Sequence, residues 1–212
     1  MGRKHRVVAK NITQHITQRG HSKKSCFYDN ADRLEYLKLL LKAKAKYPVD
    51  IHAWVLMSNH IHLLATPTED DALVRMMQSL NTQYVRYFNR KYSRSGSLWE
   101  GRYRSFPIET ERYMLEVYRY IELNPVRAGI VMDPKRYLWS SYKTNACGKT
   151  SVLVTAHSQY LALANTQEKR ILAYNALFDL AIESHPNFGI RVENFESKTL
   201  VSESNDSDTL LG

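Results

Sequence analysis

Residues 49–67 read VDIHAWVLMSNHIHLLATP, two apolar runs separated by a turn-like Ser-Asn pair. The runs are rich in residues that favour strands, and Pro67 closes the second one. The stretch therefore predicts a β-hairpin, with strands over residues 49–57 and 60–66.

The elements on either side of this hairpin are expected to give the order β-α-β-β-α-β-α. Helices are indicated by apolar residues at helical spacing, and their ends by capping residues and prolines. The clearest helical stripe is Leu73, Met77, Leu80, Tyr84 and Phe88. The other expected elements are a strand over 14–19, a helix between 30 and 47, a short edge strand over 105–109 and a helix over 111–124.

The first six elements match the split βαβ plan of an α+β fold. We expect a ferredoxin-like, or RRM-like, antiparallel sheet with helices on one face, followed by a C-terminal helical appendage. Residues 1–150 would form the main domain and residues 151–196 the appendage. Residues 197–212 contain four serines and no aromatic residue, and are expected to form a disordered tail.

The length of 212 residues fits one domain of ordinary size, or one domain with a small addition. Hydrophobic residues make up 43% and charged residues 24%, a composition typical of globular proteins. No apolar run is long enough to span a membrane and no signal peptide is visible, so a cytoplasmic protein is expected. The two cysteines lie far apart and predict neither a disulfide framework nor a cysteine zinc site.

Positive charge is concentrated in the body of the chain. The net charge is +9, but residues 193–212 hold five acids against one lysine, so residues 1–192 carry +13. Such a field favours a polyanionic partner, and nucleic acid fits better than a membrane surface because no basic amphipathic anchor is visible.

His60 and His62 stand two residues apart in the second strand of the hairpin. Alternate residues of a strand point to the same face, so both imidazoles should project together, with Cα atoms about 6 to 7 Å apart. Two such imidazoles could share one cation. Ordinary histidines on a sheet surface are the competing interpretation.

The helix over 111–124 offers two pairs of side chains at i and i+4. Tyr120 pairs with Asn124, and Tyr118 pairs with Glu122, so either pair could place a phenol beside a metal ligand. Spacing alone does not choose between them, and the aromatic residues could simply complete the core. The apolar residues that define the buried face are Met114, Val117 and Ile121.

Several blocks together resemble the REP-associated tyrosine transposases, which belong to the HUH single-tyrosine, IS200-like group. The blocks are residues 14–20, 53–64, 96–105, 120–129 and 139–142. A His-x-His pair alone is weak evidence, but these blocks occur in the family's order and spacing.

The resemblance implies an enzyme that nicks and joins single-stranded DNA at hairpins, the REP-type palindromes, through a covalent 5′-phosphotyrosine. It implies that Tyr120 is the nucleophile, and that His60, His62 and Asn124 hold Mg²⁺ or Mn²⁺. Residues 1–150 would then be the catalytic domain. A monomer or a homodimer would both fit, with hairpin DNA as partner and no membrane.

Basic and aromatic residues at the end of the helix that carries Leu73 to Phe88, and in the segment that follows it, are the expected DNA contacts. Arginines can pair with phosphates, and aromatic rings can stack on unpaired bases. Tyr84 and Phe88 are expected in the core instead, and a loop tryptophan can also plug a core edge. The candidates are Arg86, Arg90, Lys91, Arg94, Trp99, Arg102, Tyr103 and Arg104.

Two alternatives remain open at this point. A DNA-hairpin-binding protein derived from such a transposase would bind without cleaving, and its binding would survive EDTA and Tyr120→Phe. A metal-dependent phosphodiesterase that uses water as nucleophile would cleave DNA without forming a covalent adduct.

Overall fold

The structure is a computed structural model that describes residues 8–108 and 110–179, all within one compact unit, residues 1–182. Its sheet has the strand order β2-β3-β1-β4 and is antiparallel throughout. The strands are β1 (Gln14–Arg19), β2 (Val49–Leu56), β3 (His60–Pro67) and β4 (Arg104–Pro107). The helices are α1 (Asn30–Lys46), α2 (Ala72–Lys91), α3 (Glu111–Arg127), α4 (Tyr142–Cys147), α5 (Ser158–Leu161) and α6 (Gln167–Ala176), with short 3-10 turns at His21–Lys23 and Pro134–Arg136.

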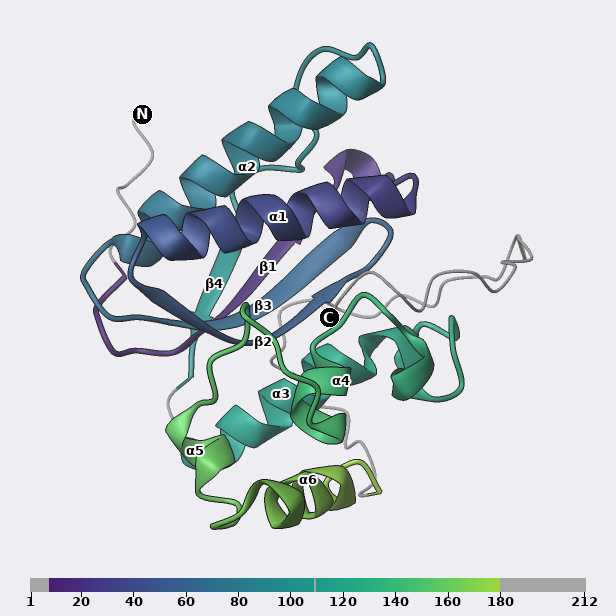
Figure 1. Cartoon of the computed structure of the whole chain (residues 1–212). Helices are drawn as coiled ribbons and strands as arrows, with labels where there is room; N and C mark the ends of the chain where they lie inside the picture. The colour runs from purple at the N-terminus through teal and green to yellow at the C-terminus, as the bar shows by residue number, and fades with distance from the viewer. Residues whose placement is uncertain (1–7, 109, 180–212) are drawn as a thin grey trace. The chain divides into compact units, whose positions relative to one another are not determined.

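The predicted α+β class, with its four-stranded antiparallel sheet and C-terminal helices, is confirmed. Helices α1 and α2 lie together on one face of the sheet, as expected. Helix α3 covers the opposite face and is followed there by α4, α5 and α6 (Figure 1). The sheet is therefore covered on both sides, which is why β1, β2 and β3 are almost continuously buried, whereas the edge strand β4 is partly exposed.

The hairpin forms where the sequence predicts it, with a register shift between Ile51 and Ala53. Strand β4 lies at the sheet edge, where Pro107 costs no interior hydrogen bond. It covers residues 104–107 rather than the expected 105–109, and residue 109 lies outside the described part of the chain.

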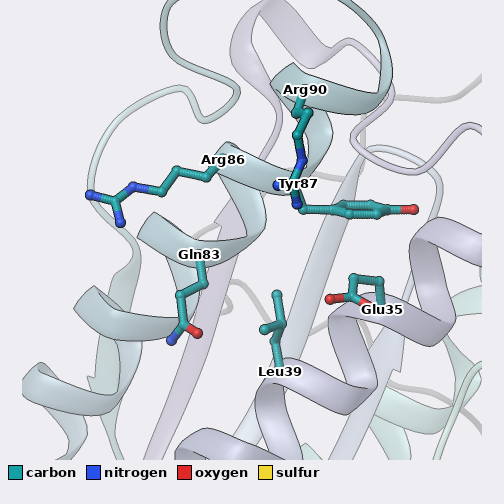
Figure 2. Close-up of a pocket in the computed structure, with 6 residues that line it drawn as sticks. All are labelled: Glu35, Leu39, Gln83, Arg86, Tyr87 and Arg90. Carbon is teal, nitrogen blue, oxygen red and sulfur yellow. The ribbon is translucent and has the colours of Figure 1, made fainter.

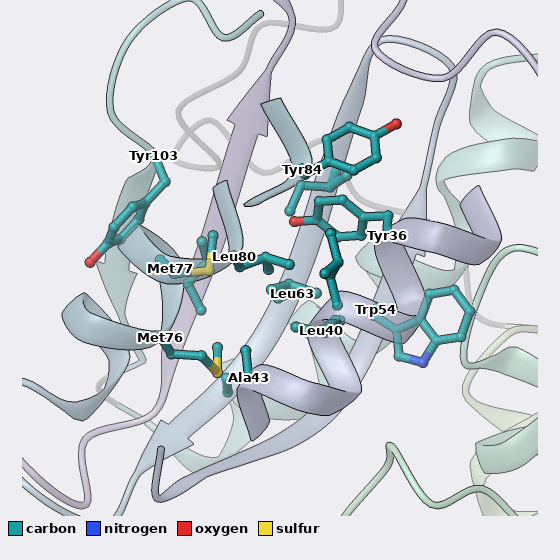
Figure 3. Packing of buried hydrophobic residues seen from close by; sticks show 14 of the residues in the cluster. Tyr36, Leu40, Ala43, Trp54, Leu63, Met76, Met77, Leu80, Tyr84 and Tyr103 are labelled. Atoms are coloured by element: carbon teal, nitrogen blue, oxygen red, sulfur yellow. The ribbon is translucent and has the colours of Figure 1, made fainter. Parts of the chain in front are cut away.

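Helix α2 buries its predicted stripe from Leu73 to Phe88 completely. Figure 3 shows its methionines and Leu80 packed towards Leu63 of β3 and Leu40 of α1. Burial of each such large side chain is worth about 1.5 to 3 kcal/mol, so this layer holds α1 and α2 against the sheet.

Helix α1 begins at a capping box, in which Asp29 and Asp32 bond each other's backbone amides. Leu34 and Leu41, two of the leucines whose spacing indicates this helix, are 46% and 39% exposed. The buried face is instead the one that carries Tyr36, because its ring fills the core against other aromatic rings.

The sequence predicts that α3 ends at Asn124. In the structure the helix continues through Pro125 to Arg127. Proline lacks the N–H that an interior position would donate, but here it stands in the last turn. The Pro125 carbonyl still accepts from the amide of Ile130 at 2.9 Å, so the helix end remains bonded.

The C-terminal segment is helical as far as the structure describes it, since α5 and α6 lie between residues 158 and 176. The expected tail at 197–212, and the appendage beyond residue 179, lie outside the described residues. Within residues 8–108 and 110–179, no helix is long and apolar enough to cross a membrane.

Candidate active site

The centre of the candidate site is the sheet face under α3. In β1 and β3, Thr17 pairs with His62 and Arg19 pairs with His60, so these four side chains share one face. Ile61 points the other way and is fully buried in the core beneath α1 and α2. The predicted projection of both histidines from one face is therefore seen in the structure.

His62 is fully buried, and its two ring nitrogens have different surroundings. Nδ1 lies 2.9 Å from Nε2 of His15, whose ring is stacked on it. Nε2 has no hydrogen-bond partner in the described part of the chain. A His62 that donates from Nδ1 to His15 leaves an unused Nε2 lone pair, the arrangement found in metal-bound histidines.

His60 is held from the turn before it. Its Nδ1 lies 2.6 Å from Oδ1 of Asn59, while the Asn59 amide nitrogen donates to the Lys23 carbonyl at 3.1 Å. The loop reaches this position because Gly20 has no side chain, since a Cβ there would collide with the Lys24 carbonyl. His60 therefore has a fixed ring, and its Nε2 is the nitrogen left for Asn124.

The three histidines are neutral at physiological pH. Burial lowers the pKa of His15 to about 4, and burial with the nearby Arg19 lowers that of His60 to about 4. Burial also holds the pKa of His62 well below 6.5. Neutral imidazole is the form that binds a metal, so the site does not have to lose protons first.

Tyr120 of α3 packs over these histidines and is only 5% exposed. Its ring lies edge-on to His62 at 5.5 Å and to His15 at 5.7 Å, measured between centroids. Burial raises the pKa of its phenol, while Arg127, Asn124 and Arg19 act in the opposite direction. The hydroxyl is therefore protonated at neutral pH.

Asn124 stands one turn after Tyr120 and is hydrogen-bonded to both His60 and the Tyr120 hydroxyl. Its amide nitrogen also donates to the Tyr120 carbonyl at 2.9 Å. The side chain is thus fixed between the histidine and the tyrosine, with its amide nitrogen on the backbone carbonyl.

Tyr118 and Glu122 lie on the other flank of α3. Tyr118 is fully buried against the rings of Tyr160 and Tyr174. The Glu122 carboxylate accepts hydrogen bonds of 2.6 to 2.7 Å from Ser141, Asn145 and Tyr174, and burial raises its pKa to about 7. This pair joins α3 to the C-terminal helices, and Tyr120 with Asn124 is the pair that meets the histidines.

Two of the expected DNA contacts lie on the far side of the sheet. Arg86 and Arg90 project from α2 beside a pocket of about 440 Å³ between α1 and α2, which Figure 2 shows. Because α1 and α2 cover the face opposite α3, these arginines cannot reach a phosphate bound at Tyr120.

Three further candidates have structural partners. Lys91 forms ion pairs of 2.8 Å with both Asp29 and Asp32. Trp99 is 6% exposed and packs against the Tyr84 ring, and Tyr103 is 7% exposed within the core cluster. A buried ring offers no face to a base.

The remaining basic candidates are exposed. Arg104 of β4 shares the sheet face of His62, because Thr17 pairs with both residues. Arg102 lies in the loop just before it. Arg94 has its guanidinium 5.4 Å from the Phe88 ring at the end of α2. Arg104 is therefore the DNA-contact candidate best placed relative to Tyr120.

The described residues contain no group of three His, Cys, Asp or Glu side chains that could hold a metal. A metal centre here would combine the two imidazoles with the amide oxygen of Asn124. The unused Nε2 of His62 fits such a role, since a buried polar atom without a partner is costly unless a ligand satisfies it.

Sequence comparison decides the family. The family model described as "Transposase IS200 like" matches residues 8–124, more than half of the chain. This chain belongs to the IS200-like transposases. The resemblance expected from the sequence blocks is confirmed.

Two curated relatives of this IS200-like transposase are named REP-associated tyrosine transposases. The Haemophilus influenzae protein is 29% identical over 106 residues, and the Escherichia coli K12 protein 25% identical over 104 residues. The matches cover 45% and 49% of this chain and 60% of each relative's length.

A solved structure of a REP-associated tyrosine transposase bound to a REP hairpin has the same fold. It superposes with a TM-score of 0.60 at 22% identity, over 75% of this chain and 96% of that one.

His15 is the site residue that sequence reasoning did not single out. It lies in the 14–20 block, and strand alternation places it on the face of Thr17. That signal was available, but its contact with His62 depends on the register between two strands far apart in the sequence.

Proposed function

We propose that this transposase nicks and rejoins single-stranded DNA beside a hairpin, with Tyr120 as the nucleophile. The observation that carries the proposal is the packing of the Tyr120 ring against His62, whose Nε2 has no partner. The unused Nε2 of His62 is costly in a purely structural core, and beside the phenol it is suited to a reaction centre.

In the proposed step, the Tyr120 oxygen attacks the phosphorus of one backbone linkage. The bond from phosphorus to the 3′ oxygen breaks, which leaves a 5′-phosphotyrosine and a free 3′-hydroxyl. The phenol proton is lost and the leaving 3′ oxygen gains one, so the net charge is conserved. The tyrosine ester keeps the phosphodiester's reactivity for a second transfer that rejoins DNA.

His60, His62 and Asn124 would hold the divalent cation, Mg²⁺ or Mn²⁺. When bound, such an ion stabilises negative charge on phosphate oxygens and favours the ionised phenol. Imidazole nitrogens suit Mn²⁺ better than Mg²⁺, and the amide oxygen suits both. Asn59 and His15 orient the two imidazoles towards this role.

The DNA would approach across the open side of β4. Arg104, on the sheet face of His62, and Arg102 beside it can pair with backbone phosphates. Hairpin DNA as substrate is supported by the solved relative with its REP hairpin. We place the reaction in the cytoplasm, on the nucleoid when DNA is bound, with the enzyme acting as a monomer or a homodimer.

The experiment is adduct formation on hairpin DNA that carries a single-stranded 5′ flank and a 3′ label. The protein is incubated with Mn²⁺, Mg²⁺ or EDTA and separated under denaturing conditions. A metal-dependent labelled adduct that vanishes in Tyr120→Phe but persists in Tyr118→Phe supports the proposal. Metal-dependent cleavage without an adduct indicates water as the nucleophile.

A hairpin-binding protein without chemistry is the second candidate. The absence of a third histidine or carboxylate ligand in the described residues favours it. Binding that is equal in EDTA and in Tyr120→Phe, with neither adduct nor cut product over a panel of flanks, would establish this alternative.

A further inference from the structure

Two arginines flank Tyr120. Arg127 follows it by two turns on α3, and its guanidinium carbon lies 4.9 Å from the centre of the Tyr120 ring. Arg19 comes from the end of β1, where it is paired with His60. Both are partly buried, and both lower the pKa of His62, so their charges act on the site.

In the described part of the chain, neither arginine forms an ion pair with a carboxylate. Within residues 8–108 and 110–179, every ion pair of an Asp or Glu side chain is with a lysine or arginine other than Arg19 and Arg127. The Nε of Arg19 is buried and has no hydrogen-bond partner in that part of the chain. Two positive charges therefore stand beside a tyrosine and neutral histidines without a carboxylate between them.

A cation over an aromatic ring is a modestly favourable contact, which is enough to explain the position of Arg127 taken alone. It does not explain Arg19, because a buried guanidinium nitrogen without an acceptor costs free energy. An anionic ligand would satisfy both groups at once. The planar fork of a guanidinium fits the paired oxygens of a phosphate.

We propose that Arg19 and Arg127 form a phosphate clamp, which binds the non-bridging oxygens of the linkage that Tyr120 attacks. This inference rests on the proposed function and adds two substrate-binding residues to it. The clamp would position phosphorus in front of the phenol oxygen independently of any bound cation.

The test is a binding experiment in EDTA, so it needs neither metal nor turnover. Hairpin DNA is prepared with one uncharged methylphosphonate at each linkage of the flank in turn. With the unmodified protein, the methylphosphonate at one linkage should weaken DNA binding roughly tenfold or more. This is the loss expected when hydrogen bonds to a charged group are removed. In Arg127→Gln and in Arg19→Gln that loss should shrink to less than about threefold.

Arg112→Gln is the matched control on the same helix. Its side chain is 89% exposed and paired with Glu116, so it should keep the full loss at that linkage. Arg127→Lys keeps the positive charge but not the planar guanidinium. Its loss of binding at that linkage should lie between those of the unmodified protein and Arg127→Gln. Thermal unfolding of each variant identifies any that fail to fold, and the lysine variant then carries the test for Arg127.

The clamp is overturned if no linkage shows a loss that depends on either arginine. Adduct formation on the same DNA separates this result from the proposed function. If an adduct forms but the loss of binding does not depend on either arginine, only the clamp is contradicted. If one linkage shows an arginine-dependent loss but no adduct forms, the clamp is supported and the proposed chemistry is contradicted.

Discussion

His62 and His15 share a hydrogen bond of 2.9 Å between Nδ1 and Nε2, and their rings are stacked at 5.1 Å. This contact fixes which nitrogen of His62 is left for another ligand. It links β3 to β1 inside the site, so the reaction centre depends on sheet register as well as on the His-x-His pair.

Replacing His15 should therefore weaken metal binding without removing a ligand. In His15→Leu the Nδ1 of His62 loses its partner, and we expect Mn²⁺ affinity to fall about 10- to 100-fold. Electron paramagnetic resonance of free Mn²⁺ measures this directly. His52→Gln, at a buried histidine bonded to Thr66 and Thr155, is the control. Equal Mn²⁺ affinity in His15→Leu and the unmodified protein would contradict this role.

Asn124 can be tested as a ligand by two substitutions. Asn124→Asp keeps an oxygen at the same place and should retain or raise Mn²⁺ affinity, whereas Asn124→Ala should lower it. If Asn124 only bonds the Tyr120 carbonyl, the alanine variant would lose thermal stability and keep its Mn²⁺ affinity. Isothermal titration at a fixed pH separates these outcomes.

Glu122 should make the fold less stable as pH rises. Burial raises its pKa from 4.5 to about 7, so between these values the folded state holds more protons than the unfolded state. The stability it contributes is full below pH 4.5 and is lost by about pH 7, roughly 3 kcal/mol at most. Urea unfolding from pH 5 to 8 should show this loss relative to Glu122→Gln. Parallel pH profiles of the two proteins would refute it.

His52 should have the opposite effect in acid. Burial lowers its pKa to about 4, so the folded state holds it neutral. Stability should rise between pH 4 and 6.5, because there the unfolded state binds the additional proton. His52→Gln should flatten this part of the urea-unfolding profile. A His52→Gln profile as steep as that of the unmodified protein would contradict the prediction.

The fold was largely predictable because its main signals are local. The 49–67 hairpin and the stripe of α2 follow directly from alternation and helical spacing. The buried face of α1 was not predictable in the same way, since leucines occur around the helix and Tyr36 selects the face through tertiary contacts. The end of α3 was predicted wrongly from Pro125, because a helix tolerates one missing N–H in its last turn.

The candidate site was predictable only in part. Strand alternation places His60 and His62 together, but helical spacing could not choose between Tyr118 and Tyr120. That choice depends on which flank of α3 meets the sheet and which meets the C-terminal helices. Trp99 and Tyr103 lie in a basic segment and are nonetheless core residues, because composition does not report burial.

The most direct measurement is to identify the residue that carries DNA. An adduct formed on hairpin DNA with Mn²⁺ is digested with nuclease and protease, and the modified peptide is sequenced by mass spectrometry. We predict a 5′-linked nucleotide on Tyr120 and on no other tyrosine. A nucleotide on Tyr118 or another residue, or metal-dependent cleavage with no modified peptide, would contradict it.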